Sequence, residues 1–257
     1  RFHRVILDQD FNAAVCQVPL LGPLGWHRNY LLVGLPLMEA MTENEFKAVV
    51  AHEFGHLGGD HGKFGSWVYR TRATWATLVE SIQSSNQGGI GSRITLSFLG
   101  WFWPRFNAHA FGLSREQEYE ADALAVKVYG AESLANGLQR TEVMGRAVNE
   151  GWENVSHLVH EFAEVPRNVY DRLSQFAEGA RDEKGSLWFR QALNRLTDTS
   201  DTHPSLNDRL SAIGVSPGED KLPPIEVSQS AAVQALGVPG VKQFRDGFSQ
   251  TWAQMVG

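Results

Sequence analysis

The sequence of 257 residues contains a single cysteine, Cys16, which excludes an internal disulfide framework and a cysteine-rich zinc site. We expect this thiol to be buried beside Val15 and Val18. Basic residues are not in excess either. The 29 acidic and 23 basic residues give a formal charge of −6, so the sequence lacks the electrostatic footprint of a nucleic-acid-binding protein.

Long hydrophobic runs are also missing. The best apolar stretch, 94–104, lies between Arg93 and Arg105 and is shorter than the roughly 18 residues of a membrane span. No basic segment followed by an apolar core comes after Arg1, so we expect no signal peptide in this chain. The aromatic segment 98–104 is either a buried cluster or a surface that touches lipid or an apolar substrate.

The most informative motif is H-E-x-x-H at 52–56. His52 and His56 are four residues apart, so on a helix both imidazoles lie on one face and can reach one metal ion. The carboxylate of Glu53 then lies beside the metal, where it can take a proton from an activated water.

The sequence around this motif predicts a helix from about 42 to 63. Thr42 and Glu45 form a Thr-x-x-Glu capping box at its start. One apolar stripe follows at helical spacing, formed by Phe46, Val49, Val50, Phe54 and Leu57.

The rest of the chain predicts an α+β fold that is predominantly helical, with a small N-terminal β-sheet. We expect extended structure over the first 40 residues, with strands at 13–18 and 30–33, and a flexible loop at 84–92. A second capping box, Ser114 with Gln117, predicts the start of another helix that closes at Gly130. Further helices are expected at 66–83, 131–149, 152–164, 168–179 and 186–197. We divide the chain into a domain at 1–216 and a linker with a helical tail at 217–257.

A catalytic zinc ion needs a third protein ligand, and several known spacings fail here. The metzincin pattern requires a histidine at position 62, which is glycine, with His61 one residue early. An acid about twenty residues downstream is absent, since positions 75 and 76 are Trp75 and Ala76. The segment 157–161 resembles an inverted motif with its Glu and His exchanged, and a polar helix face explains it better.

Glu118 and Asp122 are the remaining candidates. They share one helical face with Ala121 and Ala125, whose small side chains allow a close approach to the first helix. Glu118 could then bind zinc, with Asp122 accepting a hydrogen bond from a ligand histidine. The alternative, an exposed acidic helix face, stays open from the residues alone.

At these residues the chain resembles the HtpX-like and CAAX prenyl-protease family of gluzincin zinc endopeptidases. The resemblance is carried by the motifs at 52–56 and 114–122, by Thr-His-Pro-Ser with a later Arg-Leu at 202–210, and more weakly by Asn-Ala-Ala at 12–14. It implies a zincin-like core with one zinc ion per chain, bound by His52, His56 and Glu118.

The resemblance also implies the remaining roles. Glu53 would be general base and then acid, Asp122 would orient a ligand histidine, and His203 would donate a hydrogen bond to the oxyanion. Arg209 would support the loop of His203 or the acidic residues behind the ligands. From the sequence alone, His203 with Pro204 is also a rigid turn before a helix that Ser205 caps, with Asp208 at the capping-box position.

One departure from the family concerns 64–113, where integral-membrane members carry hydrophobic spans. The charged residues of this segment do not suit a transmembrane hairpin, so we expect a helical insert or lid. We therefore do not assign the substrates of known family members to this chain. We expect membrane association by peripheral contact or by an anchor outside this chain, a protein or peptide substrate, and no nucleic-acid partner.

The predicted function is a zinc-dependent endopeptidase that hydrolyses internal peptide bonds. We expect the substrate to lie extended along the early strand, pairing its backbone with Tyr30, Leu31, Leu32 and Val33. The alternative is a catalytically silent, zinc-stabilised module that binds or chaperones other proteins.

Overall fold

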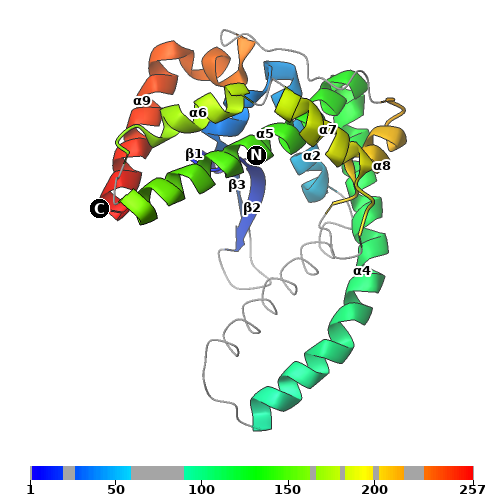
Figure 1. The fold of residues 1–257 in the computed structure, drawn as a ribbon. Helices are drawn as coiled ribbons and strands as arrows, with labels where there is room; N and C mark the ends of the chain where they lie inside the picture. The colour runs from blue at the N-terminus through cyan, green and yellow to red at the C-terminus, as the bar shows by residue number, and fades with distance from the viewer. Residues whose placement is uncertain are drawn as a thin grey trace.

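The computed structural model describes residues 2–19, 27–58, 90–162, 166–179, 183–198, 203–216 and 229–256. It is mostly helical, with a small sheet near the N-terminus (Figure 1). The strands are β1 (Arg4–Asp8), β2 (Ala13–Pro19) and β3 (His27–Gly34). The helices are α1 (Leu35–Ala40), α2 (Glu43–Gly58), α4 (Ile90–Tyr129), α5 (Ala131–Phe162), α6 (Val169–Gly179), α7 (Glu183–Asn194), α8 (Leu206–Ala212) and α9 (Ala231–Val256). The α+β class with a predominance of helix is confirmed.

The described strands form one sheet in the order β1-β3-β2. β1 is parallel to β3, with Arg4 opposite Tyr30, and β2 is antiparallel to β3, with Val15 opposite Leu31. β1 did not stand out in the sequence. The single thiol, Cys16, lies on β2 and is exposed, so the expected burial is wrong.

The central place of β3 corrects our expectation for the substrate. Residues 30–33 are paired with β1 on one side and with β2 on the other, so both backbone edges of this segment are already used. A substrate cannot add to β3 by strand pairing at Tyr30, Leu31, Leu32 or Val33 in this sheet. The only outer strands among the described residues are β1 and β2.

The start of α2 follows the capping box that the sequence predicts. The backbone N–H of Thr42 donates to Glu45 Oε2 at 2.8 Å, and the N–H of Glu45 reaches Thr42 Oγ1 at 3.5 Å. Arg140 on α5 also donates to Glu45 Oε2, at 3.0 Å, which joins this helix start to a buried ion pair. The preceding residues are not extended as expected, because Leu35–Ala40 form the short helix α1 with Pro36 in its first turn.

α4 is longer than the sequence predicts. Residues 90–92, expected in a loop, are helical, and the helix runs through Ser114 without a new start. Ser114 does not start a new helix, because the backbone N–H groups around 114–117 already lie inside a continuing helix and need no cap. The N-terminal half of α4 projects from the body of the molecule as an arm (Figure 1). The rest of the expected insert, 64–89, and the helix expected at 66–83 lie outside the described residues.

The other helices largely follow the predicted pattern. α6, α7 and α9 are confirmed with small shifts of their ends, whereas 131–149 and 152–164 are one helix, α5, that continues through Gly151. The expected linker at 217–224 lies outside the described residues. Within the described residues, no helix combines the length and apolar character that a membrane crossing requires.

Two buried clusters fix the positions of these elements. The larger one joins α2, α4, α5, α7 and α8 through residues such as Ala48, Ala125, Leu134, Phe189 and Leu210. The second joins β3, α1 and α9 through Val33, Leu35 and Ala232. The C-terminal helix therefore shares a core with the N-terminal sheet, and the first cluster holds α2 against α4.

Candidate metal centre

The site lies where α2 and α4 approach each other. Gly55, inside the motif at 52–56, faces Ala121 so closely that a Cβ on Gly55 would lie 2.6 Å from Ala121 Cα. Ala121 and Ala125 are buried, as the sequence predicts for a close contact. Small residues on both helices therefore bring the side chains of Glu118 and Asp122 to the two histidines.

Three side chains converge at this contact. His52 Nε2 lies 3.2 Å from His56 Nε2 and 3.6 Å from Glu118 Oε2, and His56 Nε2 lies 3.4 Å from Glu118 Oε1. Tetrahedral zinc ligands with bonds of about 2.0–2.1 Å lie roughly 3.3–3.4 Å apart. Two ring nitrogens and one carboxylate at these separations fit a zinc ion.

Glu118 is buried whereas Glu116 and Glu120 are exposed. The exposed acidic face that we left open is therefore formed by the neighbours of Glu118, and Glu118 itself points to the histidines. Its pKa lies below the usual value: burial opposes ionisation, but the hydrogen bond with His203 and nearby positive charge outweigh it. The carboxylate is thus ionised and available to a cation.

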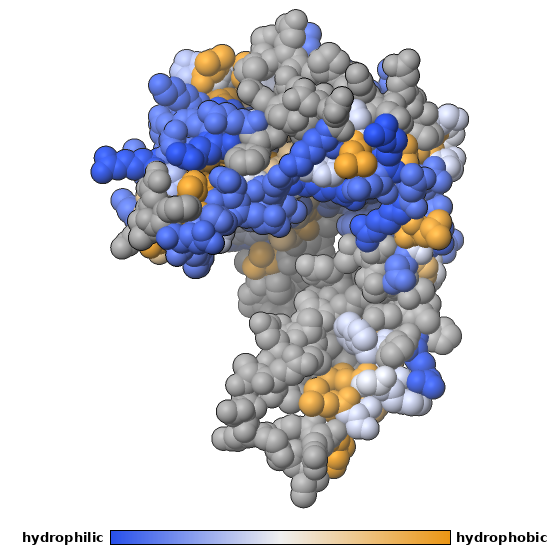
Figure 2. All heavy atoms as spheres, viewed as in Figure 1, coloured by the Kyte–Doolittle hydropathy of each residue, from blue (hydrophilic) through white to orange (hydrophobic). Residues whose placement is uncertain are grey.

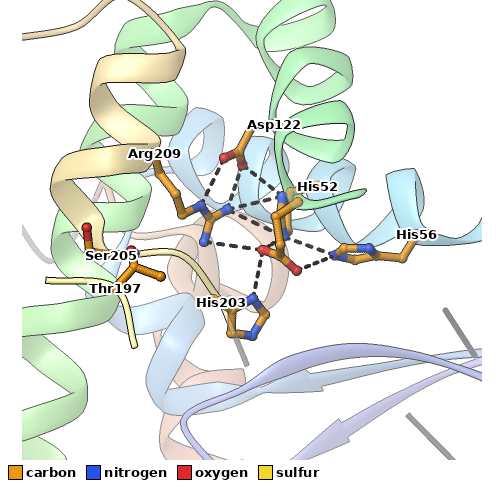
Figure 3. A network of polar contacts seen from close by, with 8 residues as sticks. His52, His56, Asp122, Thr197, His203, Ser205 and Arg209 are labelled. Atoms are coloured by element: carbon orange, nitrogen blue, oxygen red, sulfur yellow. Dashed lines mark hydrogen bonds and ion pairs between the residues drawn. The ribbon is translucent and has the colours of Figure 1, made fainter. Parts of the chain in front are cut away.

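The ring of His52 is held in place by Asp122 and Arg209, on the side of the ring away from His56. Its Nδ1 lies 2.9 Å from Asp122 Oδ1, and Arg209 donates two bonds to the same carboxylate, from Nε at 2.9 Å and from Nη2 at 2.6 Å (Figure 3). Burial disfavours the charge on Asp122, but these partners lower its pKa to about 2. An ionised carboxylate only accepts hydrogen bonds, so Nδ1 carries the proton and Nε2 presents a lone pair to the site.

His56 and Glu53 complete the part of the site on α2. Burial and the neighbouring His52 lower the pKa of His56 to about 4, so its ring is neutral near pH 7. Burial raises the pKa of Glu53, although His52 and His203 act in the opposite direction. A neutral imidazole is the form that binds a metal.

His203 reaches the site from the turn before α8. Its Nδ1 lies 2.7 Å from Glu118 Oε2, and this hydrogen bond raises the pKa of His203. His52, Glu118 and His203 also form a possible donor set, with ligand atoms within 4.8 Å of one another. The set of His52, His56 and Glu118 is tighter, because no two of its ligand atoms measured above are more than 3.6 Å apart. His203, in contrast, is half exposed.

The turn that carries His203 is built differently from a simple capping box. Ser205 caps α8 as predicted, accepting the backbone N–H of Asp208 at 3.2 Å. The Asp208 side chain does not return this bond, because the backbone N–H of Ser205 donates to Thr197 Oγ1 at 2.7 Å. Thr197 comes from the segment after α7, and no sequence motif marks it.

The other histidine-rich segment, 157–161, forms a polar helix face, as we expected. His157 contacts Glu161 at 3.3 Å and His160 contacts the carbonyl of Ser156 at 2.8 Å, all on exposed positions of α5. His61 lies outside the described residues.

Comparison with known proteins gives a consistent result. A family model described as Peptidase family M48 matches residues 24–215. The chain is 28% identical over 209 residues to Protease HtpX of Chromohalobacter salexigens, and 27% identical over 205 residues to Protease HtpX of Pseudomonas savastanoi pv. phaseolicola. Each alignment covers 74% of this chain and 59% of the relative. A Protease HtpX homolog of Neisseria meningitidis is 31% identical over 127 residues, 45% of this chain and 46% of that protein. No solved structure matches significantly.

The chain thus spans about 59% of the length of the first two of these relatives. The resemblance to HtpX-like peptidases is confirmed, and the matched region contains all the residues that meet at the α2–α4 contact and in the turn before α8. Because the family model covers well over half of its length, this chain belongs to peptidase family M48.

Proposed function

We propose that this chain is a zinc-dependent endopeptidase, with one zinc ion bound by His52, His56 and Glu118. The observation that carries the proposal is the convergence of two ring nitrogens and one carboxylate at separations of 3.2–3.6 Å. Asp122 and Arg209 keep the His52 ring in the tautomer that a metal needs.

When bound, zinc supplies Lewis-acid chemistry, which lowers the pKa of water and polarises a carbonyl group. Glu53 accepts the proton of the attacking water and passes it to the leaving amide nitrogen. His203 donates a hydrogen bond to the tetrahedral oxyanion, and the loss of one such donor typically costs about 10²–10³ in turnover. Membership in a peptidase family and the burial of Glu118 beside His203 support these roles.

The substrate, in our proposal, pairs with the outer edge of β2 rather than with β3. Among the described strands, β2 pairs only with β3, and its first residue, Ala13, packs in a cluster with Phe46 and Val49 of α2. The Asn-Ala-Ala segment at 12–14 lies at the start of this edge. A cross-linker on a peptide inhibitor should label β2 positions, and labelling confined to β1 would contradict this docking.

Glu53→Gln tests the chemistry. The amide keeps the size of the side chain but cannot accept a proton, so we expect zinc content to stay unchanged and peptide cleavage to fall by at least about 10³. Quenched-peptide cleavage and metal analysis measure the two effects. Chelation should abolish cleavage and added zinc should restore it.

The same assays separate the alternative function. A protein that binds zinc at these residues but cleaves none of a diverse peptide library is the silent binding module. Unchanged turnover in Glu53→Gln would remove Glu53 from the mechanism while leaving the peptidase itself in place.

We also propose that the arm of α4 touches a lipid surface. Ile94, Phe98 and Trp101 lie on one helical face and are 65%, 49% and 56% exposed. The Arg105 guanidinium lies 4.9 Å from the Trp101 ring centre, which places a positive charge beside the apolar stripe. Hydrophobic side chains gather on this arm, whereas the body presents mostly hydrophilic ones on the same side (Figure 2). Aromatic side chains with a neighbouring arginine suit a membrane–water interface.

A further inference from the structure

We propose that Thr197 is a positioning residue that holds the turn of His203 in its working place. The inference rests on the proposed function, because it assigns Thr197 to the residue that would stabilise the oxyanion. Its basis is a closed cycle of hydrogen bonds among Thr197, Ser205 and Asp208, which joins the segment after α7 to the start of α8. Figure 3 shows Thr197 and Ser205 beside the turn that carries His203.

The cycle uses both capacities of the threonine hydroxyl. Thr197 Oγ1 accepts the backbone N–H of Ser205 at 2.7 Å and donates to Asp208 Oδ2 at 2.5 Å. The backbone N–H of Asp208 returns to Ser205 Oγ at 3.2 Å. A valine has the same shape but can make neither bond of the hydroxyl.

Pro204 explains why the bond to Ser205 matters for His203. Proline has no backbone N–H, so the N–H of Ser205 is the first backbone donor after the histidine. Thr197 accepts this donor, and Ser205 is buried. The first backbone N–H group after His203 is therefore held by a hydrogen bond, which fixes the turn between His203 and α8.

The same cycle is connected to the helix that carries Glu118. Arg115, three residues before Glu118 on α4, donates to Asp208 Oδ2 at 3.3 Å and to the Tyr119 hydroxyl at 2.8 Å. The ion pair of Arg115 with Asp208 is about one-third exposed and contributes little alone. Asp208 is therefore connected both to the turn of His203, through Thr197, and to the helix of Glu118, through Arg115. The hydrogen bond from Thr197 to Asp208 Oδ2 is the shorter of the two, 2.5 Å against 3.3 Å from Arg115.

Thr197→Val should therefore lower kcat by about 10–100-fold, because a displacement of about 1 Å at a catalytic group has this size of effect. KM and zinc content should stay within about twofold of the parent, since neither the peptide edge nor the zinc ligands change. Thr197→Ser keeps the hydroxyl and should restore kcat. Thr141→Val is the matched control, because the Thr141 hydroxyl bonds to the carbonyl of Gly137 within α5, away from the turn.

A double-mutant cycle with His203→Ala decides whether Thr197 acts through the histidine. We expect Thr197→Val to cause no further loss of kcat when His203 is already alanine. An equal loss in both backgrounds, or a fall in zinc content together with kcat, would overturn the inference in favour of a general structural role.

A readout without catalysis keeps the two proposals distinguishable. In Thr197→Val, the Ser205 amide should exchange with solvent faster and the NMR signals of the His203 ring should shift, whereas Thr197→Ser should preserve both. Unchanged signals would overturn the role of Thr197 even in an active enzyme. If the parent protein cleaves no peptide, the proposed function fails, and these signals still decide whether Thr197 positions His203.

Discussion

Two glutamates of α4 illustrate how a single residue of the site is selected. Glu118 is buried and lies within 3.4–3.6 Å of the two histidines, whereas Glu116, two positions earlier, is exposed. Two residues correspond to about 200° around a helix, so the two carboxylates face different surroundings. Only one of them can reach the histidines of α2.

Replacing these glutamates in turn tests the ligand set. Glu118→Ala should weaken zinc binding by at least about a hundredfold, since even a residue behind a ligand typically contributes 10–100-fold. Glu116→Ala should leave the affinity unchanged. Competition with a zinc-binding dye measures both constants, and equal affinities in the two variants would refute Glu118 as a ligand.

Among single residues, the sequence predicts those whose spacing along the chain is enough to place them on one face of a helix. The four-residue separations of His52 and His56, and of Glu118 and Asp122, are enough to place each pair on one face of a helix. Thr197 has no such signal. Its partners are eight and eleven residues away, and only the tertiary fold brings its hydroxyl to Ser205 and Asp208.

At the scale of elements, the contact between α2 and α4 depends on Gly55. A Cβ added there meets Ala121 Cα at 2.6 Å and Ala121 Cβ at 2.7 Å, and a backbone atom cannot move aside as a flexible side chain can. The two helices would have to separate. This separation would move Glu118 away from the histidines, although Gly55 itself binds nothing.

Gly55→Ala should therefore weaken zinc binding and lower the free energy of unfolding by about 1–3 kcal/mol, the usual cost of overpacking. Helix propensity alone predicts the opposite, since alanine is favoured over glycine by about 1 kcal/mol within a helix. Gly112→Ala on helix α4 is the control, because its Cβ meets nothing within 4 Å and should be neutral or stabilising. Denaturant unfolding of the two variants, with metal analysis, checks the contrast; a stabilised Gly55→Ala would contradict it.

The sequence predicts elements well where an apolar period is strong and less well where local signals compete. The capping box of Thr42 and Glu45 is formed, and α9 lies where its pattern places it. The similar box at Ser114 is inactive, since α4 already passes through it. The helix α1 was missed, and β1 was expected only as part of an extended region and not as a separate strand, because both are short and depend on packing with the sheet and α9.

For the whole molecule, the unequal distribution of polarity is the main feature beyond the site. The body is covered largely by hydrophilic side chains on the side shown, and the arm of α4 presents an apolar stripe (Figure 2). A stripe of this kind is what the proposed contact with a lipid surface requires.

Replacing Phe98 and Trp101 together with serine should lower binding to anionic lipid vesicles by at least about tenfold. Each side chain contributes about 1.5–3 kcal/mol on full burial, and partial insertion of both exceeds the 1.4 kcal/mol that a factor of ten requires. Val128→Ser is the control, since Val128 is also exposed on α4 but lies at its opposite end. Vesicle sedimentation measures the binding; a parent protein that stays in solution would refute the lipid contact.

The arm and Glu118 belong to one helix, and Pro104 lies between them. Proline lacks the N–H that would bond to the carbonyl of Gly100, so the hydrogen-bond ladder of α4 is interrupted there. Arg105 Nη1 donates to the carbonyl of Trp101 at 2.7 Å, on the arm side of the interruption. A bend at this point changes the direction of the arm without bending the segment from Pro104 to Glu118. In the proposed lipid contact, the arm could therefore meet a surface at varied angles while His52, His56 and Glu118 keep their mutual separations.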